Sequence, residues 1–485
     1  MRPKLELLDR DLLARILDEA FEILEVIGTK VGAPEALDLL ASAGARIEGG
    51  VARLPEALVR RTLQSVPHEF FLYDRTGQPT VHYGGDDVHF DPGSSCLNIL
   101  DGETGQPRPA MTADLVRMVQ VTEMLPQYAA QATALVCNDV PSEMGDWYRL
   151  LLVLWYSDKP IVTGAFSVPT LRTMFDLLAA DSGGMAVLQE KPRAIFDVCP
   201  SPPLNWSAFA SQNMIELARA GVPAEIVSMP LAGATAPVTL AGAVVQHAAE
   251  CLAGICIHQL AKAGAPVVWG GAPAIFDMST GNTPMGAIET AMLDMGCAQV
   301  GKSLGLPTHG YLVASDARQI DAQAGLESGS SALLGALAGI NMISGAGMLD
   351  FLACHSIEKL VIDADAIAGA QRLIGGIEPR SEKLALDMFT QTGIHGDFLK
   401  LKETRALFRK EQHFPSAVID RSGDSNVSGI LTRARQRADE LVAGYQRPAI
   451  SPEVETALVT VALRQAKASG LDSLPGIELP AVVSR

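Results

Sequence analysis

Several features that mark particular classes of protein are scarce in this sequence of 485 residues. Aromatic residues make up only 5% of it, and charged residues only 19%. The seven cysteines form no C-x-x-C pair and lie in apolar surroundings, which predicts buried free thiols rather than disulfides or a zinc ribbon. No H-E-x-x-H motif occurs, so zinc proteolysis has no support.

Basic residues are also fewer than acidic ones. The chain has 38 lysines and arginines against 55 acidic residues, which gives a net charge of −17. This balance opposes non-specific binding to nucleic acid or to an anionic membrane. Apolar residues make up 48% of the chain, so we expect a large buried core rather than disorder.

Neither a signal peptide nor a membrane span is expected. The N-terminal MRPKLELLDRDLLARILDEAF carries acidic residues through its apolar stretch and has no small-residue cleavage site, so we expect a cytoplasmic protein. The uncharged stretch at 328–349 is rich in Gly, Ala and Ser. We interpret it as a helix and a strand in close contact within a soluble domain.

From residue 130 onward, short apolar runs alternate with loops and helical patterns. Seven such runs begin 30 to 42 residues apart: 130–137, 160–166, 194–199, 225–229, 266–270, 308–314 and 340–344. Continuous apolar runs at this spacing are typical of βα repeats with strands buried on both faces. We therefore predict an α/β protein with a (β/α)₈ TIM barrel, and we expect the eighth strand between residues 350 and 363.

Three regions follow from this pattern. Residues 1–110 combine three helices with short β-like runs such as FFLYD, TVHYG, VHFD and CLNIL, and we expect an N-terminal extension there. Residues 111–380 form the predicted barrel, and residues 381–485 form a helical extension. The alternative is a doubly wound open sheet, which is weakened because no G-x-G-x-x-G follows the first strand.

In a barrel, the reacting groups follow the carboxyl ends of the strands. Four aromatic residues near such ends could surround an organic cation by cation–π attraction: Phe166, Trp206, Trp269 and Tyr311. Each is more often buried for its apolar area than used for a cation, so ordinary core contacts are the competing interpretation.

Polar candidates gather after the sixth strand. The segment SDARQIDAQAGLESG at 315–329 contains Asp316, Gln323 and Glu327, and it could line a ligand or form a solvated loop before a helix. His309 and His355 also lie near predicted strand ends. For metals, His247, Cys251 and His258 fall near one face of a helix, but no further ligands occur at zinc-motif spacing, so we predict no metal site.

Taken in order, five stretches carry a family resemblance: LDGETGQPRPAMTADLVRM, CNDVP, DMSTGNTPMGAIET, SDARQIDAQAGLE, and GAGMLD followed by SIEKLVID. The chain resembles the trimethylamine methyltransferase family of corrinoid-dependent enzymes from about residue 12 to residue 421. DAQAGLE is the most specific part of the match.

The resemblance implies a TIM-barrel methyltransferase whose mouth meets a separate cobalamin-binding corrinoid protein, with no cofactor bound tightly by this chain. Archaeal members that demethylate trimethylamine use pyrrolysine, and this chain contains only the twenty standard residues. It is therefore similar to the non-pyrrolysine branch, which implies a quaternary amine such as glycine betaine as substrate. We also expect self-association.

On this interpretation the nine candidates form a substrate site in which the aromatic rings surround the onium and the polar groups complete the lining. A betaine carboxylate would need an anchor, and Arg318 or a glycine-rich strand end could supply one. Two other functions stay open at this point. One is a non-catalytic quaternary-amine binding protein; the other is a barrel lyase or aldolase, although no lysine occupies a predicted strand end.

Overall fold

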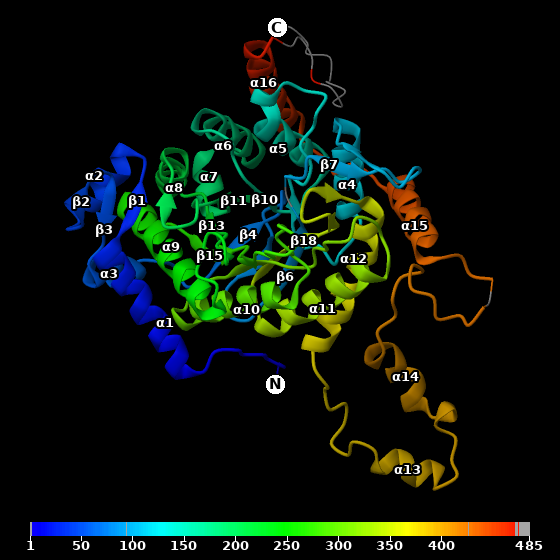
Figure 1. Ribbon diagram of the computed structural model, residues 1–485. Coiled ribbons are helices and arrows are strands. Elements are labelled where there is room, and N and C mark those ends of the chain that lie inside the picture. The colour runs from blue at the N-terminus through cyan, green and yellow to red at the C-terminus, as the bar shows by residue number, and fades with distance from the viewer. Residues whose placement is uncertain (1, 94, 425, 471–473, 475–485) are drawn as a thin grey trace.

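Eight parallel strands form a closed barrel at the centre of the molecule (Figure 1). The computed structural model describes residues 2–93, 95–424, 426–470 and 474. In barrel order the strands are β6 (His89–Pro92), β9 (Gln131–Ala132), β10 (Ile161–Thr163), β11 (Ala194–Val198), β13 (Ala224–Ser228), β15 (Val267–Gly271), β17 (His309–Tyr311) and β18 (Met342–Ala346). The predicted TIM barrel is therefore confirmed.

The ring closes through three links. Strand β18 pairs in parallel with β6, and β15 joins β17 through a bridge between Trp269 and Thr308. The Ala129 N–H donates to the carbonyl of Phe90 at 2.9 Å, which joins the start of β9 to β6. Since closure removes exposed strand edges, every barrel strand has a partner on each side.

The expected position of the eighth strand is wrong. Residues 350–363 contain only the short β20 (Cys354–His355), which pairs outside the barrel, and the start of a helix. The missing strand is β6, the VHFD run that we assigned to the N-terminal extension. The barrel consequently begins at His89, before the predicted boundary at residue 110. Its strands and helices then alternate in eight units.

Helices cover the outside of the barrel. The eight that follow the strands are α4 (Thr112–Glu123), α5 (Gly145–Tyr156), α6 (Val168–Ser182), α8 (Ala208–Ala220), α9 (Leu240–Ala261), α10 (Ile288–Ser303), α11 (Ala322–Ala338) and α12 (Ile357–Ile374). Helix α9 is long and apolar enough to cross a membrane, but 83% of its apolar window is buried inside the protein. The uncharged stretch at 328–349 divides between α11 and β18, as expected.

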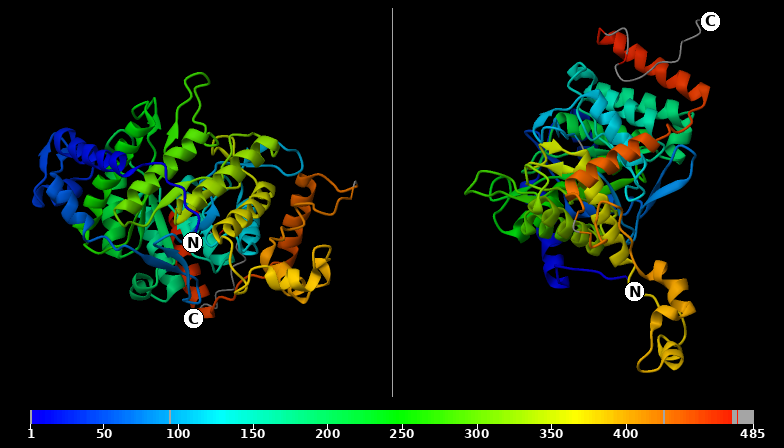
Figure 2. Two further views of the ribbon diagram at one scale, coloured as in Figure 1. Left: turned by 90° about the horizontal axis from the view of Figure 1, so that it is seen from below. Right: turned by 90° about the vertical axis from the view of Figure 1, so that its right-hand side faces the viewer.

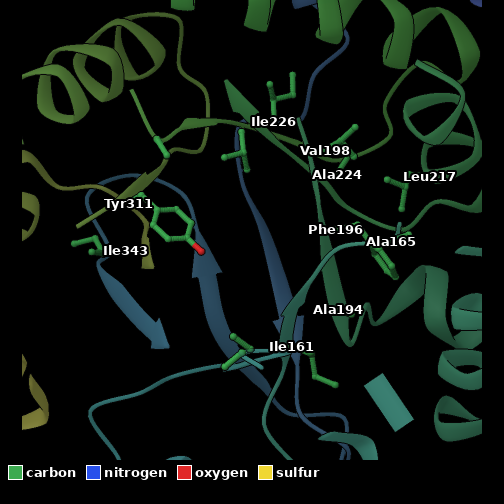
Figure 3. Packing of buried hydrophobic residues seen from close by; sticks show 14 of the residues in the cluster. Ile161, Ala165, Ala194, Phe196, Val198, Leu217, Ala224, Ile226, Tyr311 and Ile343 are labelled. Atoms are coloured by element: carbon green, nitrogen blue, oxygen red, sulfur yellow. The ribbon is translucent and has the colours of Figure 1, made fainter. Parts of the chain in front are cut away.

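Alternate strand residues face either these helices or the barrel interior. Figure 3 shows Phe196 and Val198 on the side of β11 that faces Leu217 of α8, whereas Tyr311 lies inside the ring of strands. At the amino-terminal end of the barrel, the hairpin of β4 (Phe70–Tyr73) and β5 (Pro79–Tyr83) closes the interior. Its buried side chains contact inward residues of four strands: Val162, Ile195, Val268 and Met342.

The remaining short elements lie around the barrel, and the N-terminal unit packs against the outer helices α8 and α9 (Figure 1). The N-terminal unit consists of α1 (Arg10–Glu22), a π-helical turn (Ile23–Ile27), β1 (Thr29–Val31), α2 (Pro34–Ser42), β2 (Arg46–Glu48), β3 (Val51–Arg53) and α3 (Glu56–Leu63), and β12 (Asn205–Trp206) joins its sheet. Near the carboxyl ends of the barrel strands lie β7 (Asn98–Leu100), β8 (Pro107–Pro109), β14 (Leu231–Ala232), β16 (Ala274–Ile275), β19 (Met348–Leu349) and β20; two further short helices are a 3₁₀ turn (Ser142–Met144) and α7 (Met185–Glu190).

The C-terminal extension is mostly helical up to residue 470, and residues 471–473 and 475–485 of the predicted extension lie outside the described residues. Its elements are α13 (Leu386–Thr392), a 3₁₀ turn (Phe398–Lys400), α14 (Lys402–Glu411), α15 (Ile430–Gly444) and α16 (Pro452–Ala468). Helix α15 lies against α12 and α4, and α16 lies against α6. Helices α13 and α14 project from the body of the molecule and contain no buried residue (Figure 2).

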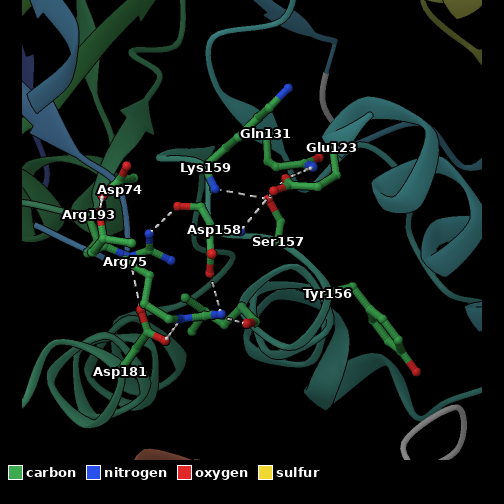
Figure 4. A network of polar contacts seen from close by, with 12 residues as sticks. Asp74, Arg75, Glu123, Gln131, Tyr156, Ser157, Asp158, Lys159, Asp181 and Arg193 are labelled. Atoms are coloured by element: carbon green, nitrogen blue, oxygen red, sulfur yellow. Dashed lines mark hydrogen bonds and ion pairs between the residues drawn. The ribbon is translucent and has the colours of Figure 1, made fainter. Parts of the chain in front are cut away.

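A buried ionic network fixes the hairpin to the barrel (Figure 4). Asp181 of α6 accepts from Arg75, which follows β4, and from Arg193, which precedes β11, both at 2.9 Å. Arg75 also reaches Asp158 at 2.7 Å. The Asp181 side chain has no exposed surface. Losing it would leave the buried Arg193 without an ion pair and Arg75 with Asp158 alone.

We therefore expect Asp181→Asn to lower the free energy of unfolding by about 3–5 kcal/mol, as measured by urea denaturation. Asp176→Asn in the same helix is the matched control, because Asp176 and its partner Arg464 are both more than half exposed. The control should lose less than about 1 kcal/mol. Equal losses in the two variants would contradict this account of the network.

Candidate active site

A layer of polar side chains lies inside the barrel, directly above the apolar contacts of the hairpin. It contains Tyr83 from β5, Asp91 from β6, Asp197 from β11, Glu225 from β13, His309 from β17 and Ser344 from β18. Asp91 and Glu225 have no exposed surface, and the other members are also buried or nearly so. Asp197 and Glu225 are register partners on neighbouring strands, so their side chains point the same way. We call these six residues the carboxyl layer.

Hydrogen bonds connect the carboxyl layer across the barrel. The Tyr83 hydroxyl donates to Glu225 Oε2 at 3.2 Å, and the carboxyl groups of Glu225 and Asp197 are hydrogen-bonded to each other. On the other side, the Ser344 hydroxyl donates to Asp91 Oδ1 at 2.6 Å.

His309 joins the two halves of the layer. Its Nε2 lies 3.0 Å from Ser344 Oγ and 3.5 Å from Glu225 Oε1. Because Ser344 gives its only proton to Asp91, the network assigns the ring proton of His309 to Nε2. Nδ1 then carries a lone pair with no hydrogen-bond donor near it.

Burial controls the charge of this layer. It raises the pKa of Asp197 to about 7 and holds the pKa values of Glu225 and Asp91 well above their usual range, because an ionised carboxyl loses its hydration inside the barrel. The neighbouring carboxyl charge raises the pKa of Glu225 further. Burial also lowers the pKa of His309 to about 3, so its contact with Glu225 joins neutral groups and is not an ion pair.

Among the described residues, no lysine or arginine lies within ion-pair distance of these three carboxyl groups. His309 does, but its ring is neutral. Asp91 Oδ2 has no hydrogen-bond donor, and Asp197 Oδ1 and Glu225 Oε1 have none other than the proton that the pair shares. Buried acids in this state become ionised when a positive ligand compensates the lost hydration. The arrangement therefore suits a small organic cation.

Two of the predicted residues lie inside the barrel. His309 belongs to the carboxyl layer, and Tyr311 lies two residues further along β17, beside it in an edge-to-face contact with ring centroids 5.8 Å apart. Tyr311 is 7% exposed and points inward from the same face of the strand. An aromatic face above a carboxyl layer is a favourable surrounding for an onium group.

The predicted roles of Trp206 and Trp269 are wrong. Trp269 alternates with the inward-facing Val268 and Gly270, so its ring points outward and its Nε1 donates to the carbonyl of Cys297 in α10 at 2.9 Å. Trp206 donates to the carbonyl of Glu250 in α9 at 3.2 Å, and its ring lies against Gly254. Both are core side chains between the barrel and its helices.

The polar candidates after the sixth strand hold two loops together. Asp316 accepts from the backbone N–H groups of Met285 and Gly286 at 2.8 and 3.0 Å. Glu327 accepts from the Ser315 hydroxyl at 2.5 Å, and Gln323 donates to Glu327 at 2.8 Å. The structure thus joins DMSTGNTPMGAIET to SDARQIDAQAGLE, and these side chains satisfy one another instead of lining the barrel interior.

Gly286 shows how tightly the two loops fit. A Cβ at this position would lie 2.3 Å from Cδ of Glu327. Only glycine allows the first loop to approach the carboxyl group of the second so closely. The segment at 315–329 is therefore a positioning element at the rim of the barrel.

The last two candidates differ in their surroundings. His355 is fully buried against Gly347, and neither ring nitrogen has a hydrogen-bond partner in the described chain. Burial lowers its pKa to about 3. Phe166 follows β10, is 51% exposed and lies over the guanidinium of Arg149 with its ring centroid 4.7 Å away. A substrate contact remains a prediction for both.

No group of three or more His, Cys, Asp or Glu side chains that could hold a metal ion occurs in the part of the chain that the structure describes. His247 and Cys251 both approach the carbonyl of Gly270, at 3.1 and 3.6 Å, which gives these side chains a structural role.

Two short patterns in α10 have the wrong surroundings for their usual chemistry. GCAQVGKS at 296–303 matches the P-loop pattern, and the overlapping GKSLG at 301–305 matches the nucleophile pattern G-x-S-x-G. Both lie at the end of a helix rather than between a strand and a helix. The Ser303 hydroxyl donates to the carbonyl of Val300 in the preceding turn.

The three acids of the carboxyl layer are not among the predicted site residues, although the sequence carries a signal for them. Asp91, Asp197 and Glu225 lie within the apolar runs VHFD, AIFDVC and EIVSM. A charged residue inside a strand that is buried on both faces is rarely accommodated without a partner. Position near the carboxyl end of a predicted barrel strand does not select these three acids.

Comparisons with known proteins agree with this architecture. A family model described as trimethylamine methyltransferase matches residues 1–470. The trimethylamine methyltransferase of Desulfitobacterium hafniense is 29% identical over 93% of this chain and 92% of its own. A second one, from Methanosarcina mazei, is 32% identical over 93% of each chain. The glycine betaine methyltransferase of D. hafniense is 28% identical over 96% of this chain and 98% of its own.

Among solved structures, the monomethylamine methyltransferase of Methanosarcina barkeri aligns with 91% of this chain and 89% of its own, with a TM-score of 0.50 and 11% identity. At that identity, the likeness concerns the fold alone.

The raised pKa of Asp197 makes the stability of the ligand-free protein depend on pH. Between about pH 4, where an ordinary Asp titrates, and about pH 7, the folded state keeps a proton that the unfolded state loses. Stability should therefore fall as pH rises through this interval. We expect Asp197→Asn to flatten the curve, measured as the urea midpoint from pH 4.5 to pH 8.

Asp277→Asn, which alters an exposed carboxyl group at the rim, should retain the wild-type slope in this interval. If the wild-type and Asp197→Asn curves run parallel, Asp197 does not hold a proton in the folded state.

Proposed function

The chain belongs to the trimethylamine methyltransferase family, and we propose that it moves a methyl group from a quaternary amine such as glycine betaine to Co(I) of a separate cobalamin-binding protein. Family membership makes it a methyltransferase that acts on methylated amines. The observation that supports a quaternary amine is the buried carboxyl layer, which has no cation of its own in the described structure.

A quaternary nitrogen keeps its positive charge when it leaves water. A protonated tertiary amine can instead pass its proton to a buried carboxylate, which leaves two neutral groups. Because the pKa values of Asp91, Asp197 and Glu225 are all raised, this loss of charge would be favoured here. A quaternary amine, whose positive charge is fixed, is therefore stabilised more by the carboxyl layer than a protonated tertiary amine is.

Methyl transfer from such a substrate needs no proton. Co(I) supplies the electron pair that takes up the methyl group, while the electrons of the broken C–N bond stay on nitrogen and give a neutral tertiary amine. No acid or base is required at nitrogen, so the protein contributes positioning and electrostatics. This division suits an interior in which His309 is buried and neutral.

The carboxyl layer can balance the onium without holding it too strongly. Positive charge on nitrogen falls as the C–N bond breaks, so a fully ionised layer would stabilise the bound substrate more than the transition state. Asp197 and Glu225 share a proton and carry less than two full charges. The hairpin closes the lower end of the barrel, and Tyr311 lies above the layer, which limits the access of water to the methyl group.

Calorimetric titration with glycine betaine, carnitine, proline betaine and trimethylamine should show binding of at least one quaternary amine. A purified protein that binds it should also transfer a methyl group to free Co(I) cobalamin, followed by the absorbance of the methylated product. Glu225→Gln should weaken binding by at least about 30-fold, which corresponds to about 2 kcal/mol.

Asp277→Asn at the rim should bind like the wild type, because Asp277 is exposed and bonds only to its own loop. Preference for trimethylamine over every quaternary amine would argue against the proposed substrate. Absence of both binding and transfer would exclude the proposed reaction.

A further inference from the structure

Arg149 is a fully buried arginine at the carboxyl ends of three barrel strands. It belongs to α5, and its Nη1 donates to the carbonyl of Thr133, just beyond β9, at 2.7 Å. The same nitrogen reaches the hydroxyl of Ser95, beyond β6, at 3.1 Å. Phe166, beyond β10, covers the guanidinium with its ring. The side chain is thus fixed at the edge of the barrel from which substrates approach.

No carboxylate of the described residues lies within ion-pair distance of Arg149, and its Nη2 has no hydrogen-bond partner. The carboxylate of the nearby Asp146 binds other groups. It accepts from the N–H of Trp147 and the N–H of Phe166, and from the hydroxyl of Thr170. The guanidinium keeps its charge at neutral pH, since burial lowers the pKa only to about 10.

Arg193, another buried arginine, differs from Arg149 because it has a carboxylate partner. It is 2% exposed and pairs with Asp181 at 2.9 Å. Burying a guanidinium without an anionic partner is unfavourable. A buried arginine that has no such partner in the protein is therefore a candidate for binding an anionic group of a ligand. Arg149 presents a planar donor group of the kind that binds carboxylates.

We propose that Arg149 binds the carboxylate of a zwitterionic substrate, which makes a betaine, rather than a simple methylated amine, the substrate class of this enzyme. The inference rests on the proposed function, because the onium of the same molecule would occupy the carboxyl layer. It also separates this chain from relatives that act on trimethylamine, which carries no carboxylate.

Arg149 and the carboxyl layer belong to the same side of the barrel, and the strand register relates them. The Thr133 hydroxyl lies 3.0 Å from that of Thr163 on the neighbouring strand β10. Thr163 is the register partner of Phe196, which directly precedes Asp197. The backbone of Thr133, which holds Arg149, is therefore two strands away from Asp197 and close to it in register. On this proposal, a substrate with opposite charges at its two ends would place its onium at the carboxyl layer and its carboxylate at Arg149.

Phe166 controls access to Arg149. Its ring covers the guanidinium on one side and is half exposed on the other, so rotation of this ring would open Nη2 to a carboxylate. The substrate carboxylate would replace a cation–π contact by an ion pair with parallel hydrogen bonds. The predicted contact between Phe166 and the substrate would then be with its carboxylate end.

Arg318, the anchor that the sequence suggested, is a weaker candidate. Its side chain is 79% exposed and already pairs with Asp350 at 3.1 Å. An exposed and paired arginine gains little from a further carboxylate. It provides the control, since Arg318→Met removes a cation near the same mouth.

The test compares glycine betaine with tetramethylammonium, which has the same onium and no carboxylate. Methyl transfer to free Co(I) cobalamin gives kcat/KM for each, and calorimetry gives Kd. Wild type should favour glycine betaine by at least tenfold. Arg149→Met should lower kcat/KM for glycine betaine by about 100-fold and change that for tetramethylammonium by less than about threefold. Arg149→Lys should restore part of the loss, and Arg318→Met should resemble wild type.

Each outcome bears on a separate claim. An equal loss for both substrates in a folded Arg149→Lys variant would show a structural role and overturn the proposal. A wild type that demethylates both substrates equally well would also overturn it, while methyl transfer from quaternary amines would stand. A wild type that neither binds nor demethylates either compound would overturn the proposed function as well. Thermal unfolding midpoints identify variants that fail to fold.

Discussion

The burial of three carboxyl groups inside one barrel is the constraint on which the rest of the structure depends. Asp91, Asp197 and Glu225 lie on three different strands and have no cationic partner among the described residues. In the absence of a ligand they can only be accommodated by holding protons and sharing hydrogen bonds with Tyr83, Ser344 and each other. A positive ligand changes this balance, and that change links the fold to its chemistry.

Other parts of the architecture serve this layer. The closing strand β6 brings Asp91 into the interior, and the hairpin below it contributes Tyr83 and a dry apolar floor. The ion pairs of Asp181 with Arg75 and Arg193 fix that hairpin. At the opposite end, the contact of Asp316 with the backbone at 285–286 positions the rim loops. Arg149, an unpaired cation at the same edge, adds the complementary charge that a zwitterion would need.

Much of the fold could be predicted from the sequence because parallel strands buried on both faces leave continuous apolar runs at regular spacing. Seven strands were found in this way. The eighth was missed because β6 has only four residues, includes two polar ones and follows directly on a hairpin with a similar pattern. For the site, position near a strand end predicted His309 and Tyr311, which lie inside the barrel, but it also predicted Trp206 and Trp269, which point outward. Strand position alone does not tell which face of the sheet a side chain occupies; the inward alternation of Val268 and Gly270 does.

The central claim is that the carboxyl layer exchanges protons for the positive charge of the substrate. Calorimetric titration with glycine betaine near pH 6.5, in buffers of different ionisation enthalpy, measures this exchange directly. The account predicts release of a proton on binding, with a smaller release in Asp197→Asn, because the cation favours the ionised form of groups whose pKa values are raised in the free protein. Binding without any proton release, with the same heat in every buffer, would contradict it.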